Sequence, residues 1–246
     1  MPVALITGSG SKRVGGAVAD ALAERGYSLA VHYRSSAVEA AERVAAYRAR
    51  GLEAEAFAGD LTYEADVRRL IEQTLSRFGQ LDALVNCAAI WRSKPLEEVT
   101  AADVREHFEA NTLATFLCAQ HAGLAMVRQP SGGCIVTLGD WAIDRPYLNY
   151  AAYFPSKGAI PTLTRCLAVE LGTRNPRVRV NAVLPGPVML PADLPAAERE
   201  AAINATLVHR EGSPANIAQA VLYLLDNDFV TGDCLRVDGG RSVWAP

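Results

Sequence analysis

A regular alternation of two kinds of segment constrains the fold of this chain most strongly. Short aliphatic or β-branched runs alternate with longer Ala-rich segments whose apolar residues recur at helical spacing. This alternation is typical of βαβ units, in which helices bury a parallel sheet on both faces. Strands are predicted at Val3–Thr7, Ser28–Tyr33, Glu53–Ala58, Ala83–Asn86, Gly133–Leu138, Arg177–Val183 and Cys234–Val237. Helices are predicted at Val14–Arg25, Ala37–Arg50, Thr62–Phe78, Thr100–Arg128, Tyr153–Gly172 and Ser213–Leu225. The expected fold class is α/β, with one doubly wound, seven-stranded parallel sheet and helices on both faces.

The chain shows no internal boundary. No Gly-, Ser- or Pro-rich linker divides the 246 residues, and no repeat occurs beyond the βα alternation itself. A single domain over residues 1–246 is therefore expected. Its least regular stretch, Pro185–Gly212, is rich in proline and follows the carboxyl end of a predicted strand. Segments of that kind commonly cover ligands, so we expect a substrate-binding lid there.

The charge balance favours a small-molecule partner. With 24 basic and 27 acidic residues the formal net charge is -3, which provides no basic field for nucleic acid or an anionic membrane. The five cysteines are dispersed and the four histidines lack metal-ligand spacing, so we expect reduced thiols and no metal centre. The sequence also lacks an export signal and an apolar run of membrane length, and a cytoplasmic protein is expected.

The glycine-rich segment near the N-terminus predicts a dinucleotide site. Thr7–Gly16 joins the first predicted strand to the first helix, where glycines allow a turn to approach a pyrophosphate at a helix N-terminus. Gly8 and Gly10 fit the usual fingerprint, but Arg13 stands where a third glycine is expected. A tight turn without a ligand is the alternative interpretation.

The second predicted strand indicates the form of that dinucleotide. It ends in His32-Tyr33-Arg34-Ser35, without the acidic residue that would bind a ribose hydroxyl. A guanidinium with hydroxyl groups suits a 2′-phosphate, and Lys12 and Arg13 add charge on the neighbouring loop. NADP(H) is therefore favoured, although Arg34 could equally be an ordinary solvated charge.

Tyr153 and Lys157 form a pair suited to proton transfer. Their spacing of four residues brings both side chains onto one face of a predicted helix. An ammonium beside the phenol is expected to lower the pKa of Tyr153 from about 10 toward neutral pH. The same spacing also occurs in ordinary helices without a function.

Further motifs occur in the order seen in one enzyme family. They are Thr7-Gly8 with Gly15, Asp60-Leu61, Asn86-Cys87-Ala88-Ala89, Asn111, Tyr153-x-x-x-Lys157, Pro185-Gly186 and Val237-Asp238-Gly239-Gly240. Over essentially its whole length the chain therefore resembles the short-chain dehydrogenase/reductase family. The resemblance implies a Rossmann fold, a homotetramer, and Asn111 as a catalytic residue beside Tyr153 and Lys157. The cofactor-binding residues that it implies are Gly8, Lys12, Arg13, Val14, Gly15, His32, Arg34, Ser35, Asp60, Leu61, Asn86, Ala88, Tyr153, Lys157, Pro185, Gly186 and Val188.

Asp140 stands where most carbonyl-reducing members of this family have a serine, thirteen residues before the tyrosine. A carboxylate is a poor donor to an oxyanion unless protonated, but it binds N–H groups well. Together with Arg13, the strand end His32–Ser35 and Trp91, it resembles the pteridine reductases and the related dihydromonapterin- and dihydrofolate-reducing members. That resemblance implies substrate contacts from Arg13, Trp91, Asp140 and Tyr153, with Trp91 stacked on a flat heterocycle. Alternatively, Asp140 closes a local turn and Trp91 is a half-buried loop residue.

These features predict an NADPH-dependent oxidoreductase that reduces a C=N bond of a pteridine, dihydropteridine or dihydrofolate. Asp140, Tyr153, Lys157 and Asn111 are its expected catalytic residues. One alternative is a carbonyl reductase of the same family acting on a diketone or a 3-oxoacyl substrate. Another is a non-catalytic NADP(H)-binding sensor, which would have no need of proton-transfer groups.

Overall fold

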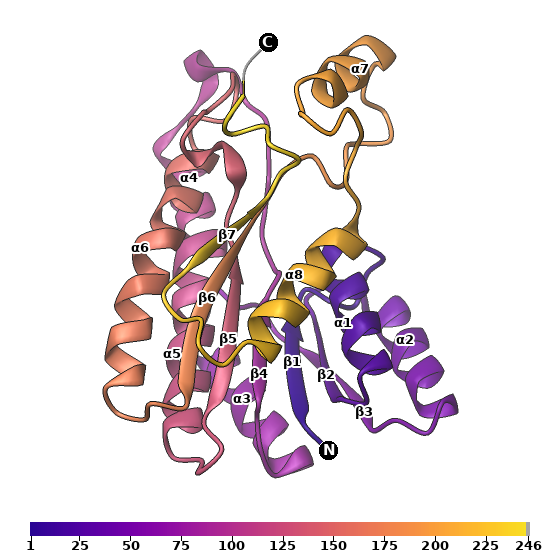
Figure 1. Cartoon of the computed structure of the whole chain (residues 1–246), viewed down its shortest axis with the longest axis vertical. Coiled ribbons are helices and arrows are strands. Elements are labelled where there is room, and N and C mark those ends of the chain that lie inside the picture. Colours follow the sequence, from indigo (N-terminus) through magenta and orange to yellow (C-terminus); the bar gives the residue numbers. More distant parts are fainter. Residues whose placement is uncertain (245–246) are drawn as a thin grey trace.

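Seven parallel strands form the centre of the computed structural model, which describes residues 1–244 (Figure 1). The strands are β1 (Val3–Thr7), β2 (Ser28–Tyr33), β3 (Ala54–Ala58), β4 (Ala83–Asn86), β5 (Gly133–Leu138), β6 (Val178–Pro185) and β7 (Cys234–Val237). Their order across the sheet is β3-β2-β1-β4-β5-β6-β7, and every neighbouring pair is parallel. The predicted doubly wound sheet is confirmed. Its order reverses between β1 and β4, which is where such sheets open a crevice at their carboxyl edge.

Helices cover both faces of the sheet (Figure 1). One layer consists of α1 (Val14–Glu24), α2 (Ala37–Ala49) and α8 (Pro214–Asp226), and the other of α3 (Glu64–Phe78), α5 (Ala114–Val127) and α6 (Tyr153–Gly172). None of the helices in residues 1–244 is both long and apolar enough to cross a membrane.

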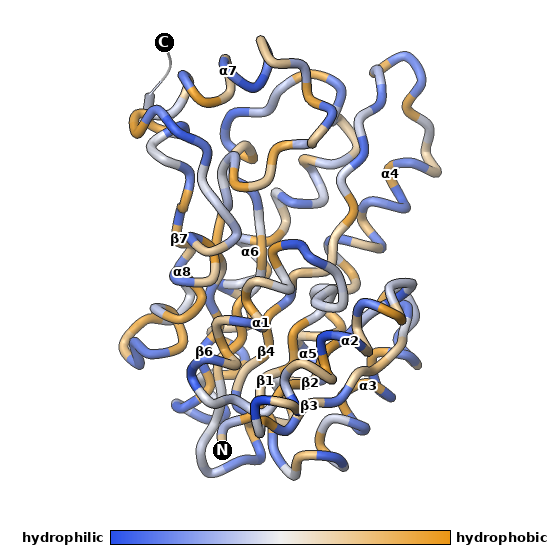
Figure 2. Tube along the Cα trace, turned by 90° about the vertical axis from the view of Figure 1, so that its right-hand side faces the viewer, coloured by the Kyte–Doolittle hydropathy of each residue, from blue (hydrophilic) through white to orange (hydrophobic). Residues whose placement is uncertain are grey.

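Residues of β1 alternate between the two layers. Ala4 and Ile6 belong to one apolar cluster and Leu5 to the other, and all three are fully buried. Removing each larger aliphatic side chain from water contributes roughly 1.5–3 kcal/mol to folding. Figure 2 shows the hydrophobic strands at the centre, with hydrophilic residues concentrated on the outer turns. Burial on both faces explains why the strands appear in the sequence as nearly continuous aliphatic runs.

The helix predicted over Thr100–Arg128 is not one regular helix. It comprises α4 (Ala101–His107), a π-helical segment (Phe108–Leu113) and α5. A π turn accommodates one residue more than an α turn and often occurs at functional sites. The apolar pattern could not reveal it, because the extra residue shifts helical phase without interrupting the run of helix-forming residues.

The Pro185–Gly212 segment contains a helix that was not predicted, α7 (Ala196–Asn204). None of its residues is buried, so the sequence carries no amphipathic stripe to indicate it. The Glu211 carboxylate accepts hydrogen bonds from the Leu190 N–H at 2.8 Å and from Arg199 at 2.6 Å. The Leu207 N–H donates to the Gly239 carbonyl at 2.8 Å. The segment is therefore braced internally and against the chain that follows β7, beside which it lies in Figure 1.

Candidate active site

A cavity of about 750 Å³ lies at the carboxyl ends of the central strands. Its floor includes Gly8 after β1, Cys87 after β4, Gly139 after β5 and Gly186 after β6. The Pro185–Gly212 segment contributes one wall. This is the position in which open parallel sheets bind their ligands.

The loop between β1 and α1 leaves room for a dinucleotide only because of its glycines. Gly8 has a φ of 64°, and a Cβ there would lie 3.0 Å from the Ala88 backbone. A Cβ on Gly15 would lie 2.7 Å from the Gly8 carbonyl oxygen. Arg13, the residue just before α1, does not cap the first N–H groups of this helix with its side chain. A close backbone approach and uncapped helical N–H groups fit the pyrophosphate of a dinucleotide.

His32 holds this loop through a hydrogen bond to its backbone. Its Nδ1 accepts a hydrogen bond from the Gly8 N–H at 3.1 Å, and its Nε2 lies 3.0 Å from the Gly59 carbonyl oxygen. Burial lowers the pKa of His32 below its ordinary value of 6.5, so the ring is neutral with its proton on Nε2. Because the imidazole is almost fully buried, we assign His32 to positioning the glycine loop.

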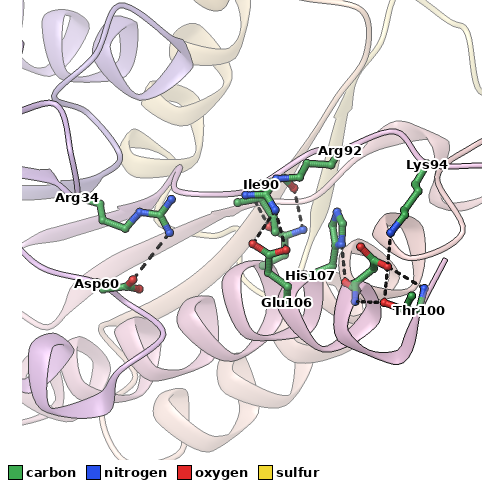
Figure 3. Close-up of polar contacts among 10 residues, drawn as sticks. Arg34, Asp60, Ile90, Arg92, Lys94, Thr100, Glu106 and His107 are labelled. Atoms are coloured by element: carbon green, nitrogen blue, oxygen red, sulfur yellow. Dashed lines mark hydrogen bonds and ion pairs between the residues drawn. The ribbon is translucent and has the colours of Figure 1, made fainter. Parts of the chain in front are cut away.

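Arg34 and Ser35 are exposed at the rim of the cavity, beyond the end of β2. Arg34 lies 3.9 Å from the Asp60 carboxylate, a long ion pair between partly exposed groups (Figure 3). Such a pair holds the guanidinium only weakly. Arg34 therefore remains able to bind a phosphate.

Most of the predicted cofactor residues line the cavity, but Lys12 and Asn86 do not, and neither does the predicted catalytic residue Asn111. Lys12 is exposed outside the cavity, and Asn86 is buried with its amide donating to the Thr115 carbonyl at 3.4 Å. The sequence could place these residues near the loops but not orient their side chains. Neither Lys12 nor Asn86 lines the cavity, and their contacts with the cofactor stay predictions.

Asn111 connects three parts of the site. Its side chain accepts from the Ile90 N–H at 2.8 Å and donates to the Ile90 carbonyl at 3.0 Å and to the Ser156 hydroxyl at 3.0 Å. It lies in the π-helical segment and is fully buried. Asn111 therefore positions the chain after β4 against α6, and does not itself line the cavity.

Salt bridges hold the chain after Ile90 onto α4 (Figure 3). Arg92 binds both carboxylate oxygens of Glu106 at 2.7 Å, and Lys94 lies 2.8 Å from an Asp103 oxygen. The segment that carries Trp91 is therefore held on both sides: Asn111 binds Ile90 before it, and α4 binds Arg92 and Lys94 after it. Its orientation is consequently set by α4 and the π-helical segment together.

Asp140, Tyr153 and Lys157 meet between β5 and the start of α6. The Tyr153 hydroxyl donates to Asp140 Oδ2 at 2.8 Å, and the other Asp140 oxygen accepts from the Ala142 N–H at 2.8 Å. Lys157 Nζ donates to the Leu138 carbonyl at 2.7 Å. All three predicted side chains line the cavity, and Lys157 and Tyr153 are buried.

The expected lowering of the Tyr153 pKa is wrong for this arrangement. Burial, followed by the charge of Asp140, raises the pKa of Tyr153 well above 10. Burial also raises the pKa of Asp140 and lowers that of Lys157 to about 8. Besides burial, the Asp140 carboxylate contributes by accepting a hydrogen bond from the phenol, while the Lys157 ammonium binds a backbone carbonyl instead of the phenol. This site holds a neutral tyrosine that is suited to giving a proton.

An aromatic wall adjoins the catalytic group. The Trp91 and Tyr150 rings stack with centroids 5.0 Å apart and planes 11° apart, and Tyr147 meets Tyr150 edge-on at 5.0 Å. Trp91 lines the cavity as predicted, and the Tyr150 ring stacks on the Trp91 ring. Sequence reasoning missed both tyrosines, although Tyr147, Tyr150 and Tyr153 recur at intervals of three residues. An aromatic wall of this kind suits a flat or cyclic ligand.

Comparisons with known proteins agree with this geometry. A family model described as "Enoyl-(Acyl carrier protein) reductase" matches residues 10–242. The 2,5-dichloro-2,5-cyclohexadiene-1,4-diol dehydrogenase of Sphingobium indicum is 36% identical, covering 96% of this chain and 95% of that protein. Hydroxynaphthalene reductase-like protein Arp2 of Metarhizium brunneum is 35% identical, covering 97% and 94%.

A similar solved structure is that of a blue fluorescent protein from a metagenomic library in complex with NADPH. It is 33% identical and superposes with a TM-score of 0.89 over 98% of each chain. Matches of this extent show that the chain belongs to the short-chain dehydrogenase/reductase family of NAD(P)(H)-dependent oxidoreductases.

Proposed function

We propose that this protein is an NADPH-dependent carbonyl reductase whose substrate carries its ketone on a ring or another flat apolar body. One observation carries the proposal: the Asp140–Tyr153 hydrogen bond and Lys157 lie beside the aromatic wall, in the same cavity as the glycine loop. Two similar proteins support it, because their names describe ring compounds, a cyclohexadiene diol and a hydroxynaphthalene.

NADPH is the proposed form of the cofactor. Arg34 stands at the end of β2, where NAD-dependent sites have an acidic residue, and its long ion pair with Asp60 leaves it able to bind a 2′-phosphate. Arg13 lies on the same cavity and adds a second cation. The NADPH complex of the similar metagenomic protein supports the same choice.

The catalytic residues divide the proton chemistry between them. When bound, NADPH supplies a hydride to the substrate's carbonyl carbon. Tyr153 donates its proton to the carbonyl oxygen as charge develops there, and its high pKa keeps the hydroxyl protonated until then. Protonated Asp140 then returns a proton to Tyr153 across 2.8 Å. Asp140 is only partly buried, so it regains its proton from solvent.

Pterin reduction is a second candidate, favoured by one specific feature. Asp140 replaces a hydroxyl donor with a carboxylate, which accepts hydrogen bonds from the N–H groups along a pterin edge. Trp91 and Tyr150 provide a stacking surface for the heterocycle. In that reaction Tyr153 or Asp140 would protonate the ring nitrogen beside the carbon that accepts the hydride.

A substrate panel separates these candidates. Purified protein is mixed with NADPH and, in separate reactions, with a tetralone, diacetyl, a 3-oxoacyl thioester and dihydrobiopterin, and NADPH consumption is followed. Turnover of the tetralone without the pterin is expected, whereas turnover of diacetyl or the thioester without the tetralone would contradict the preference for a ring. Turnover of dihydrobiopterin alone would establish the second candidate, and NADPH binding with no turnover of any substrate would favour a sensor.

We also propose that the protein is a homotetramer. Phe229, in the loop between α8 and the edge strand β7, is 97% exposed, and Val169 of α6 is 65% exposed. Exposed apolar side chains beside a free sheet edge favour association. Light scattering on a size-exclusion column should give four times the mass of one chain, and a monomer would contradict the proposal.

A further inference from the structure

Arg241 extends the cavity to a part of the chain that the catalytic motifs do not include. It follows the glycine pair after β7 and lines the cavity together with Trp141 and Tyr147. Its guanidinium carbon lies 4.8 Å from the centroid of the Trp141 ring. Its Nη1 donates to the Ala202 carbonyl of α7 at 2.9 Å. The side chain is thus held between the catalytic loop after β5 and the Pro185–Gly212 segment.

The charge of Arg241 is not neutralised within the described residues. None of the ion pairs in residues 1–244 includes it, whereas nearby Arg199 and Arg236 are paired with Glu211 and Asp144. Within residues 1–244 its side chain donates one hydrogen bond, from Nη1 to the Ala202 carbonyl. Desolvation acts to lower the pKa of Arg241, but a guanidinium stays charged at any physiological pH. Among residues 1–244, the cavity therefore presents a cation without an acidic partner and with further donor groups.

The backbone around Arg241 is fixed before any ligand binds. Asp238 accepts hydrogen bonds from the Gly240 N–H at 2.9 Å and the Ser242 N–H at 2.8 Å. Arg145 donates to the carbonyl oxygens of Arg241 at 3.2 Å and Trp244 at 2.8 Å. A cation held in this way loses little conformational entropy on binding a partner.

Tyr147 relates this cation to the reaction centre. Burial raises the pKa of Tyr147, the charge of Asp140 raises it further, and the charge of Arg241 lowers it. Asp140, Tyr147 and Arg241 also line the same cavity. A substrate in this cavity beside Tyr147 can therefore face Asp140 with one part and Arg241 with another.

We propose that Arg241 binds a carboxylate of the substrate, so that the preferred substrates are oxo acids whose ketone lies on the same molecule as the carboxylate. The proposal rests on the carbonyl reductase function. A planar guanidinium with further donor groups matches a carboxylate, and the contact gains strength in a partly desolvated site. Because the Ala202 carbonyl shares this guanidinium, the bound carboxylate also lies against the end of α7.

The test compares an oxo acid with its neutral ester. Steady-state kinetics with NADPH are measured for oxocyclohexanecarboxylate and for its methyl ester. Arg241→Gln keeps hydrogen-bonding capacity without the charge, and Glu198→Gln is the matched control because exposed Glu198 lines the same cavity. The variant Arg241→Gln is expected to lose about 10-fold to 100-fold in kcat/KM for the acid, mostly through KM, as for a charge-assisted hydrogen bond. Its kcat/KM for the ester should stay unchanged.

Other outcomes overturn the proposal. If Arg241 only clamps α7 and Trp141, the variant loses activity on acid and ester equally. If the wild type turns over the ester as well as the acid, no carboxylate is recognised. Glu198→Gln removes a negative charge from the same cavity and is expected to leave the preference for the acid unchanged. A gain in that preference as large as the loss in Arg241→Gln would assign the effect to the net charge of the cavity.

A binding measurement separates this proposal from the proposed function. If neither ketone is turned over, calorimetry on the NADPH-loaded protein compares cyclohexanecarboxylate with cyclohexylmethanol. Tighter binding of the carboxylate to the wild type, lost in Arg241→Gln, would support the anion site even though the carbonyl reductase function had failed. Equal binding of the two compounds would overturn the anion site as well.

Discussion

The Tyr153 hydroxyl donates a hydrogen bond to Asp140 across 2.8 Å, and the Lys157 ammonium is directed to the Leu138 carbonyl instead. The phenol therefore faces a carboxyl group as its nearest polar partner. Burial, followed by the charge of Asp140, raises the pKa of Tyr153, whereas burial alone raises that of Asp140 and its hydrogen bond from Tyr153 acts in the opposite direction. Protonation of Asp140 therefore favours proton donation from Tyr153 to a substrate oxygen.

Ketone reduction should consequently depend on pH through Asp140. Burial raises its pKa above 3.8, so the protonated form persists to higher pH than for an exposed aspartate. As pH rises through that pKa, kcat/KM for a ketone is expected to fall, because the carboxylate repels the developing oxyanion. In Asp140→Ser this decline with rising pH should be absent. A pH profile with the same decline in the variant would assign the titration to another group.

Replacing Tyr153 with phenylalanine should lower turnover by about 100-fold or more, the usual contribution of a positioned proton donor. NADPH affinity should be nearly unchanged, because the ring remains packed against Phe154. Single-turnover kinetics together with NADPH fluorescence titration measure both quantities. Unchanged turnover would remove Tyr153 from the mechanism.

Arg34→Ala should discriminate between the two nicotinamide cofactors. Loss of one charged contact to a 2′-phosphate is expected to raise the KM for NADPH about 10-fold or more. The KM for NADH should change little, since that cofactor has no such phosphate. Equal changes for both cofactors would mean that Arg34 supports the loop rather than the phosphate.

Asp20 is expected to stabilise the packing of α1 on α2. Its Oδ1 accepts hydrogen bonds from Arg43 and Tyr47, each at 2.6 Å. Asp20→Ala leaves the largely buried Arg43 without its carboxylate and should lower the free energy of unfolding by about 1–2 kcal/mol. Asp226→Ala is the control, because its ion pair with Arg25 is more than half exposed on both sides and should contribute little. Urea unfolding of the two variants measures the difference.

The sheet could be predicted from the sequence because strands that are buried on two faces appear as continuous aliphatic runs. Runs such as Val3–Thr7 are aliphatic at nearly every position, which is typical of a short strand that is buried on both faces. Tyr153, Lys157 and Asp140 could be predicted because their spacing within one βα unit fixes them at the same sheet edge.

What could not be predicted depends on contacts between distant segments. The raised pKa of Tyr153 follows from burial and from Asp140, whose carboxylate accepts a hydrogen bond from the Tyr153 hydroxyl. The Lys157 ammonium binds the Leu138 carbonyl instead. Arg241 lines the cavity through the turn after β7, which contacts the Pro185–Gly212 segment, and no local pattern indicates that contact. The pterin preference inferred from Asp140 likewise depended on one side chain, whose charge state is set by the fold.

The π-helical segment Phe108–Leu113 also changes the direction in which side chains project before and after it along one continuous helix. Each additional residue in a helix turns the following side chains by about 100°, so the faces of α4 and α5 need not follow one another. α4 can direct Asp103 and Glu106 toward the Trp91 segment while α5 keeps Leu117 in the core. Deleting a single residue from the segment would preserve a helix yet rotate one half against the other, so the cavity wall would move without any loss of helical content.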